Sequence, residues 1–172
     1  MKNLILIFLT ALSFNLYGQS NNQDESDKKH DLKINFLMLY IGAPALNYDY
    51  ILGHETSVGF SASVSIDDDL ETQYMISPNF RVYFGNENAN GFFIEGFMSL
   101  YGEKKDDYSD DLKMNDKEYT ALGLGAGIGG KFLTKSKKYV GELFGGLGRN
   151  FLNTDHIDDV YGRISLSLGR RF

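Results

Sequence analysis

The sequence lacks cysteine and tryptophan and has only 2 prolines among its 172 residues. Without cysteine the chain cannot form a disulfide, a thiolate zinc site, a cysteine nucleophile or a lipidated N-terminal cysteine. Beyond the first twenty residues it also lacks any apolar run approaching the roughly 18 residues of a membrane-spanning helix. The formal charge of -6 disfavours nucleic acid as a partner. Composition alone therefore indicates one soluble domain, whereas the order of the residues indicates a protein that lies in a membrane.

The first residues have the layout of a secretory signal peptide. Lys2 provides the positive start, residues 4–16 form an apolar stretch, and Gly18 is a small residue before a polar segment. Residues 19–31 are polar and mixed in charge, which is typical of a flexible tether. We therefore expect a cleaved signal peptide over 1–18, a periplasmic tether over 19–31 and a folded domain over 32–172.

Apolar residues recur at every second position from residue 32 onward, which is the period of a β-strand. The alternation predicts eight strands within residues 32–40, 46–52, 58–66, 74–84, 92–100, 122–132, 139–151 and 160–172. No helical segment intervenes, so we expect hairpin connections and an antiparallel sheet. Apart from a short first connection at 41–44, the odd-numbered connections are longer and more acidic than the even-numbered ones. Outer-membrane barrels have this asymmetry, with short periplasmic turns and longer external loops.

The two faces of the predicted strands differ sharply in chemistry. One face is apolar, whereas the other is largely glycine and serine and carries almost all the charges. Only Arg149 and Arg170 fall on the apolar face, both near strand ends where a long side chain can reach the interface. Aromatic residues gather toward the strand ends, as an interfacial girdle requires: Tyr40, Phe84, Phe92, Tyr139, Phe151 and Phe172. These features favour a membrane barrel with a polar lumen over a soluble, lipocalin-like binding barrel, which is the inverted alternative.

The last strand reads VYGRISLSLGRRF and ends in Phe172 after alternating apolar positions. This ending looks like the C-terminal signal by which the outer-membrane assembly machinery recognises its clients. The mature chain resembles the small eight-stranded outer-membrane barrels of the OmpA/OmpX-like superfamily, of the uncharacterised outer-membrane beta-barrel domain type. The resemblance implies an all-β, antiparallel, up-and-down transmembrane barrel in the outer membrane of a Gram-negative bacterium. One departure is Pro78 within the fourth strand, which predicts a bulge or a change of register there.

Charged residues on the inner face predict a lumen closed by ion pairs. Counting around the turn at 85–91 places Arg81 opposite Glu95, and similar counting places Glu142 between Lys131 and Arg171. An eight-stranded barrel is only wide enough for side chains, and an unpaired buried charge is costly. The predicted structural network comprises Arg81, Glu95, Lys131, Glu142, Arg163 and Arg171. A narrow pore for ions or small solutes is the alternative function.

Catalysis has little support in the sequence. The 3 histidines are His30 in the tether, His54 in a short turn and His156 in the last long loop. No serine or threonine beside His156 resembles the motif of a barrel hydrolase. We therefore predict no enzymatic activity, no catalytic or metal site and no cofactor.

The long loops provide the candidate partners. Their acidic residues, such as Asp67, are candidate ligands for divalent cations shared with lipopolysaccharide phosphates, and Arg149 is a candidate direct contact to those phosphates. The other expected partners are outer-membrane lipids and, during biogenesis, the barrel-assembly machinery. We expect a structural or envelope role, or surface binding through the loop at 102–119.

Overall fold

The computed structural model describes residues 28–67, 70–85, 88–106 and 116–172. The expected signal peptide and most of the expected tether lie outside these residues. The elements are β1 (His30–Asn35), α2 (Phe36–Tyr40), β2 (Ala45–Ile51), β3 (Thr56–Val64), β4 (Thr72–Phe84), β5 (Gly91–Asp106), β6 (Asp116–Leu133), β7 (Tyr139–Asn150) and β8 (Val160–Arg171). Within the described residues, the one helix is too short to cross a membrane.

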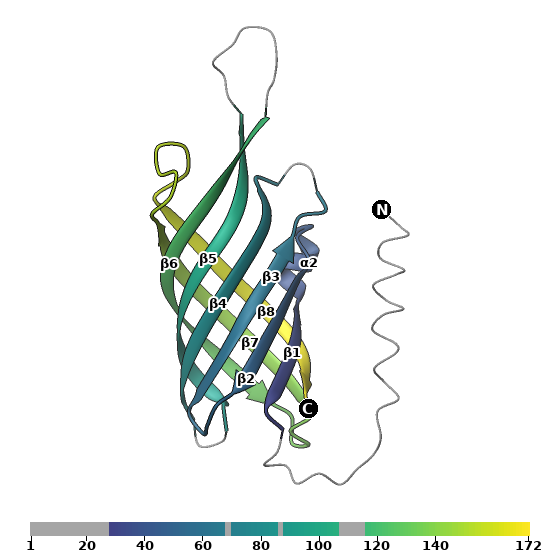
Figure 1. Cartoon of the computed structure of the whole chain (residues 1–172). Helices are drawn as coiled ribbons and strands as arrows, with labels where there is room; N and C mark the ends of the chain where they lie inside the picture. Colours follow the sequence, from purple (N-terminus) through teal and green to yellow (C-terminus); the bar gives the residue numbers. More distant parts are fainter. Residues whose placement is uncertain (1–27, 68–69, 86–87, 107–115) are drawn as a thin grey trace, which may run out of the picture.

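Each strand pairs with its neighbour in antiparallel fashion, and β1 pairs with β8 to close a barrel (Figure 1). This confirms the predicted eight-stranded up-and-down architecture. We call the end that carries the β2–β3, β4–β5 and β6–β7 connections the turn end. The opposite end, with α2 and the longer connections, is the loop end. His30 and Phe172 lie side by side at the turn end, joined by two backbone hydrogen bonds of 3.0 and 2.9 Å.

The first strand is shorter than predicted, because a helix replaces its second half. The side chain of Asn35 accepts hydrogen bonds from the backbone N–H groups of Leu37 and Met38, which is the chemistry of a helix N-cap. Gly42, with φ of 89°, follows the helix. The expectation that no helical segment lies between the strands was therefore wrong at this connection. The first strand also begins earlier than predicted, so His30 and Asp31 belong to β1 and not to the expected tether.

The β5–β6 hairpin is longer than predicted and projects beyond the other strands at the loop end (Figure 1). The expected loop at 102–119 is strand up to Asp106 and again from Asp116, and residues 107–115 lie outside the described residues. The extension places Lys104 opposite Glu118, a cross-strand pair of opposite charges. Apolar alternation does not mark this part, because neither of its faces needs to be apolar.

Pro78 does not produce the predicted bulge. Ile76 pairs with Leu100 and Asn79 with Phe97, so the β4–β5 register is the same on both sides of the proline. The irregularity lies instead between Thr72 and Tyr74, at the loop end.

Burial sorts the two faces of the barrel wall. Phe84, Phe132 and Leu147 are 60%, 62% and 68% exposed on the outside, whereas Lys33 and Glu95 are 0% exposed on the inside. A lipocalin-like barrel requires the opposite sorting, so the structure contradicts that alternative. All six aromatic residues of the expected girdle are exposed: Tyr40, Phe84, Phe92, Tyr139, Phe151 and Phe172.

The inner glycines of β6 make room for aromatic rings. A Cβ at Gly125 would collide with the ring of Phe97, and one at Gly129 with the ring of Phe93. Phe93 and Phe97 are 0% and 4% exposed, and Phe144 packs against both. Alternating glycine on one strand and large rings on its neighbours thus fill the middle of the lumen.

Candidate functional site

A continuous cluster of charged side chains occupies the turn-end half of the lumen. Seven strands contribute to it, and eight of its nine members are 5% exposed or less. Arg163 is the exception, with 11% of its side chain exposed. The lumen charge cluster comprises Asp31, Lys33, Asp49, Arg81, Glu95, Lys131, Glu142, Arg163 and Arg171.

Asp49 is the hub of the cluster. Its Oδ2 lies 2.6 Å from Lys33 Nζ, 2.7 Å from Lys131 Nζ and 2.8 Å from Arg81 Nη1. Glu142 shares all three cations, since its Oε2 lies 2.5 Å from Lys33 Nζ, 2.9 Å from Arg81 Nη1 and 3.9 Å from Lys131 Nζ. Removal of the Asp49 charge would therefore affect three cations at once.

One branch of the cluster runs through the predicted Arg81–Glu95 pair. The two residues are opposite each other on β4 and β5, as expected, and Arg81 Nε lies 2.6 Å from Glu95 Oε2. The other carboxylate oxygen of Glu95 accepts from Arg163 Nη1 at 3.1 Å. The Arg163 guanidinium also lies 4.3 Å from the ring centroid of Phe97, a cation–π contact that joins the cluster to the aromatic packing.

The other branch runs to the turn end through Asp31. Lys131 Nζ lies 3.1 Å from Asp31 Oδ2, and Arg171 donates from Nε and Nη2 to the two oxygens of the same carboxylate at 2.7 and 2.9 Å. Arg171 therefore pairs with β1. The expectation that Arg171 flanks Glu142 was wrong, because Tyr139 pairs with Arg170 and places Arg171 beyond the end of β7. The other half of that expectation, Lys131 opposite Glu142, is confirmed.

Strand β3 supplies space rather than charge. Its inward residues Ser57, Gly59 and Ser61 are small, and Ser61 Oγ accepts from Arg163 Nη2 at 2.9 Å. A Cβ at Gly59 would collide with the backbone carbonyl of Tyr48, so only glycine fits this position. These small residues leave space in the lumen for long side chains from other strands, such as that of Arg163.

The cluster contains five basic and four acidic groups, each in an ion pair. Removing one partner of a buried pair costs about 3 to 5 kcal/mol, because the remaining charge stays out of water. Salt screens such buried pairs weakly. The buried ion pairs can therefore hold the strands in a single register, which is a structural role.

The loop-end half of the lumen has different contents. Tyr101, Asn150 and Tyr161 line it, with Asn150 Nδ2 donating to the Tyr101 hydroxyl at 2.7 Å. Ile157 from the β7–β8 loop is 4% exposed and packs against Tyr101 and Ala121. This loop therefore covers the loop end of the lumen.

The turn end is covered as well. Ala89, from the connection between β4 and β5, is 0% exposed and packs with Ile51 and Tyr83. Arg171 donates to the carbonyl oxygens of Asn88 and Ala89 at 2.9 and 3.1 Å and so fixes the turn in place.

A cavity of about 60 Å³ lies beside the cluster. Its lining includes the charged residues Arg81, Glu142 and Arg163, together with Met38 of α2 and Met75. This volume has room for a small number of water molecules and for nothing larger.

The sequence places this barrel in a known protein family. Residues 4–159 match the family described as protein of unknown function, DUF3575. The chain belongs to the DUF3575 family. The match covers the DUF3575 chain through β7, and β8 with Arg163 and Arg171 follows the matched residues. No curated protein matches the sequence.

Among solved structures, the DUF3575 barrel is similar to the N-terminal β-barrel domain of Pseudomonas aeruginosa OprF. The TM-score is 0.53 at 12% sequence identity, and the alignment covers 84% of this chain and 98% of that chain. At this identity the likeness shows the fold alone, a closed eight-stranded barrel.

The three histidines of the DUF3575 chain lie in different elements of the fold. His30 is not a solvated tail residue: its Nδ1 lies 2.7 Å from the Tyr48 hydroxyl on the outer wall, and its ring stacks on Phe172. His54 lies in the β2–β3 turn at the same end, and His156 stacks on Tyr119 at the loop end. No group of three or more histidine, aspartate and glutamate residues in the described part of the chain has a geometry that could hold a metal ion.

Three members of the cluster were absent from the predicted network: Asp31, Lys33 and Asp49. Lys33 and Asp49 are charged residues on the inner face. Their position in the alternation of apolar and polar residues was sufficient to predict that they belong to the network. Asp31 has the same parity as Lys33, but the polar run before it hid the start of β1. Arg149 lies exposed on the outer wall at the loop end, and Phe172 is exposed at the turn end.

Proposed function

We propose that this protein is an outer-membrane β-barrel of a Gram-negative bacterium, with a closed lumen and a structural or surface-binding role. The observation that supports this most directly is the sorting of the wall, with ion pairs at 0% exposure inside and phenylalanine and leucine more than 50% exposed outside. In water such an outer surface would be a large contiguous apolar patch, whereas in a bilayer it meets hydrocarbon. The signal peptide expected at 1–18 provides the route of export.

A closed lumen agrees with the covering of both ends. Ile157 lies over the loop end and Ala89 over the turn end, with the ion-paired cluster between them. The cavity beside the cluster has a volume of only about 60 Å³, far less than a path through the barrel requires. These features argue against the alternative of a narrow pore.

A structural role also agrees with the positions of the candidate chemistry. His30 and His54 lie at the turn end and His156 at the loop end, so they do not converge on one catalytic centre. Partners at the membrane surface are part of the same proposal. Phe172 serves as the assembly signal, Arg149 contacts lipopolysaccharide phosphates, and loop carboxylates such as Asp67 bind divalent cations together with those phosphates. Five acidic residues of these loops, at 68, 69, 107, 110 and 111, lie outside the described residues.

The location is tested by fractionating cells that express the full chain and running the outer-membrane fraction on gels with and without boiling. We expect a band in the outer-membrane fraction that migrates faster when unboiled, because folded barrels resist the detergent. Recovery of the protein in the soluble periplasmic fraction would contradict the proposal.

The closed lumen is tested with Glu95→Ala, which leaves Arg81 and Arg163 without their shared carboxylate. We expect a loss of about 3 kcal/mol in the free energy of unfolding, with planar-bilayer conductance near baseline for both wild type and variant. Ser99→Ala, also inward on β5 but neutral, is the matched control and should cost about 1 kcal/mol. A large, stable conductance from the wild-type protein would exclude a closed lumen.

A further inference from the structure

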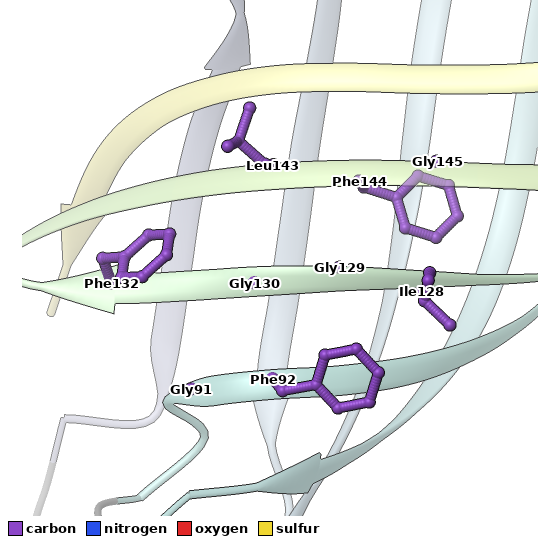
Figure 2. A pocket seen from close by; sticks show the side chains of 9 residues that line it. All are labelled: Gly91, Phe92, Ile128, Gly129, Gly130, Phe132, Leu143, Phe144 and Gly145. Atoms are coloured by element: carbon purple, nitrogen blue, oxygen red, sulfur yellow. The ribbon is translucent and has the colours of Figure 1, made fainter.

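A groove of about 490 Å³ lies on the outer wall, where β5, β6 and β7 run side by side near the turn end (Figure 2). Its volume falls in the range of sites that hold small molecules. Every residue that lines it is apolar or glycine: Gly91, Phe92, Ile128, Gly129, Gly130, Phe132, Leu143, Phe144 and Gly145.

The strand register creates this groove. Gly130 pairs with Phe92 on one side and with Leu143 on the other, so a bare backbone position lies between two large side chains. Gly145 lies beside Ile128, and a Cβ built on Gly145 meets nothing within 4 Å. Figure 2 shows the side chains of Phe92 and Leu143 on either side of the side-chain-free stretch at Gly130.

A basic turn lies directly beyond the groove. Residues 134–138 connect β6 to β7, the two strands that carry most of the groove lining, and their sequence is TKSKK. Lys135 and Lys138 are exposed. The turn has a defined shape, because Lys137 N–H donates to the Thr134 carbonyl oxygen at 2.8 Å and Thr134 N–H to that of Tyr139 at 3.1 Å. On the neighbouring strand, the exposed Arg170 pairs with Tyr139.

The groove and the turn are close enough for one molecule to contact both. Lys135 is three positions after Phe132, so at most about 10 Å of chain separates them at roughly 3.3 Å per residue. A molecule whose hydrocarbon chain lies in the groove can therefore place a polar group at the turn, beside the exposed ammonium groups of Lys135 and Lys138.

We propose that this groove and turn bind a single phospholipid with an anionic headgroup, its acyl chain over Gly130 and Gly145 and its phosphate beside Lys135 and Lys138. The inference rests on the proposed membrane location. A second copy of the chain fits the groove less well. Two barrels in the same membrane have the same orientation, so a symmetric contact through this face would bring two basic turns together.

The test is native mass spectrometry of the full chain released from nanodiscs that contain phosphatidylcholine and phosphatidylglycerol in equal amounts. We expect the wild type to retain one phosphatidylglycerol molecule in preference to phosphatidylcholine. Gly145→Leu fills the groove from a position with open space and should abolish retention of either lipid. Lys135→Gln combined with Lys138→Gln should lower the preference for phosphatidylglycerol about thirtyfold while the groove stays open.

Two matched controls accompany these variants. Gly96→Leu adds the same side chain at an outward glycine of β5 that also has open space, but outside the groove. Lys28→Gln with Lys29→Gln removes the same charge at the same end, beside β1. Both controls should retain phosphatidylglycerol as the wild type does.

Equal retention of the two lipids by the wild type, or unchanged retention by Gly145→Leu, would overturn the proposal. So would a wild-type dimer that Gly145→Leu dissociates, because the groove would then be an interface between copies. The lysine variant changes only an exposed turn and keeps the proposal testable if the groove variant does not fold. Failure of the wild type to enter nanodiscs would count against the proposed membrane location, whereas entry without lipid preference would count against this inference alone.

Discussion

The turn-end half of the lumen is held by ion pairs, whereas the loop-end half is held by hydroxyl and amide hydrogen bonds and by aromatic rings. Asp49 contacts three cations in the first half, whereas in the second half Asn150 Nδ2 donates to the Tyr101 hydroxyl at 2.7 Å. Both halves fill the same narrow lumen, but removing a side chain from each should lower the free energy of unfolding by very different amounts. A buried charge that loses its partner lowers the free energy of unfolding by several kcal/mol. A neutral polar group that loses one hydrogen bond lowers it by only about 1 kcal/mol.

Asp49→Asn should have the largest effect. The change keeps the shape of the side chain but leaves Lys33, Arg81 and Lys131 without their shared charge. We expect a loss of about 5 kcal/mol in the free energy of unfolding, measured by circular dichroism in lipid vesicles during a urea titration. Asn47→Ala is the neutral control on the same strand, where the side chain donates to Ser167 Oγ at 2.8 Å, and its expected cost is about 1 kcal/mol. Equal losses would erase the distinction between ionic and neutral groups.

Ile157→Ala should have an intermediate effect. Ile157 covers the loop end by packing against Tyr101 and Ala121, so the change leaves a space in that cover. We expect a loss of about 2 kcal/mol. Limited proteolysis should cut the 151–159 loop faster, and planar-bilayer conductance should stay near baseline because the ion-paired half remains closed. An increase in conductance would show that the loop end, rather than the charge cluster, closes the lumen.

Tyr101→Phe should have the smallest effect. It removes the hydroxyl that accepts from Asn150 Nδ2, but Asn150 keeps its hydrogen bond to the carbonyl of Asp158 at 2.6 Å. The expected loss is about 1 kcal/mol in the same titration. A loss as large as that of Asp49→Asn would mean that the neutral half is as constrained as the ionic half.

The sequence was sufficient for the strands and for the pairs that lie near each other along the chain. Arg81 and Glu95 flank one short turn, so their register follows from counting. The pair between Asp31 and Arg171 joins residues 140 positions apart, and no counting around a turn reaches it. Closure of the barrel determines that pair, and closure is a property of all eight strands together.

The helix α2 was missed for a local reason. Residues 36–40 read FLMLY, five large apolar side chains in a row, which carry neither a strand period nor a helical one. The signal that decides is Asn35, whose side chain caps the helix. The outer groove was missed because outward glycines on β6 and β7 become one depression only when the register places them beside large residues.

Asn35 also determines where the barrel is weakest. Its side chain accepts from Leu166 N–H at 3.2 Å and donates to the carbonyl oxygen of Ile164 at 3.3 Å, so it supplies the last rung of the seam between β1 and β8. That seam joins five residues of β1, Asp31 to Asn35, whereas β5 and β6 pair along 16. In a hydrogen–deuterium exchange experiment the amides along this seam should therefore lose protection first, and a barrel pulled apart by force should open there, from the side.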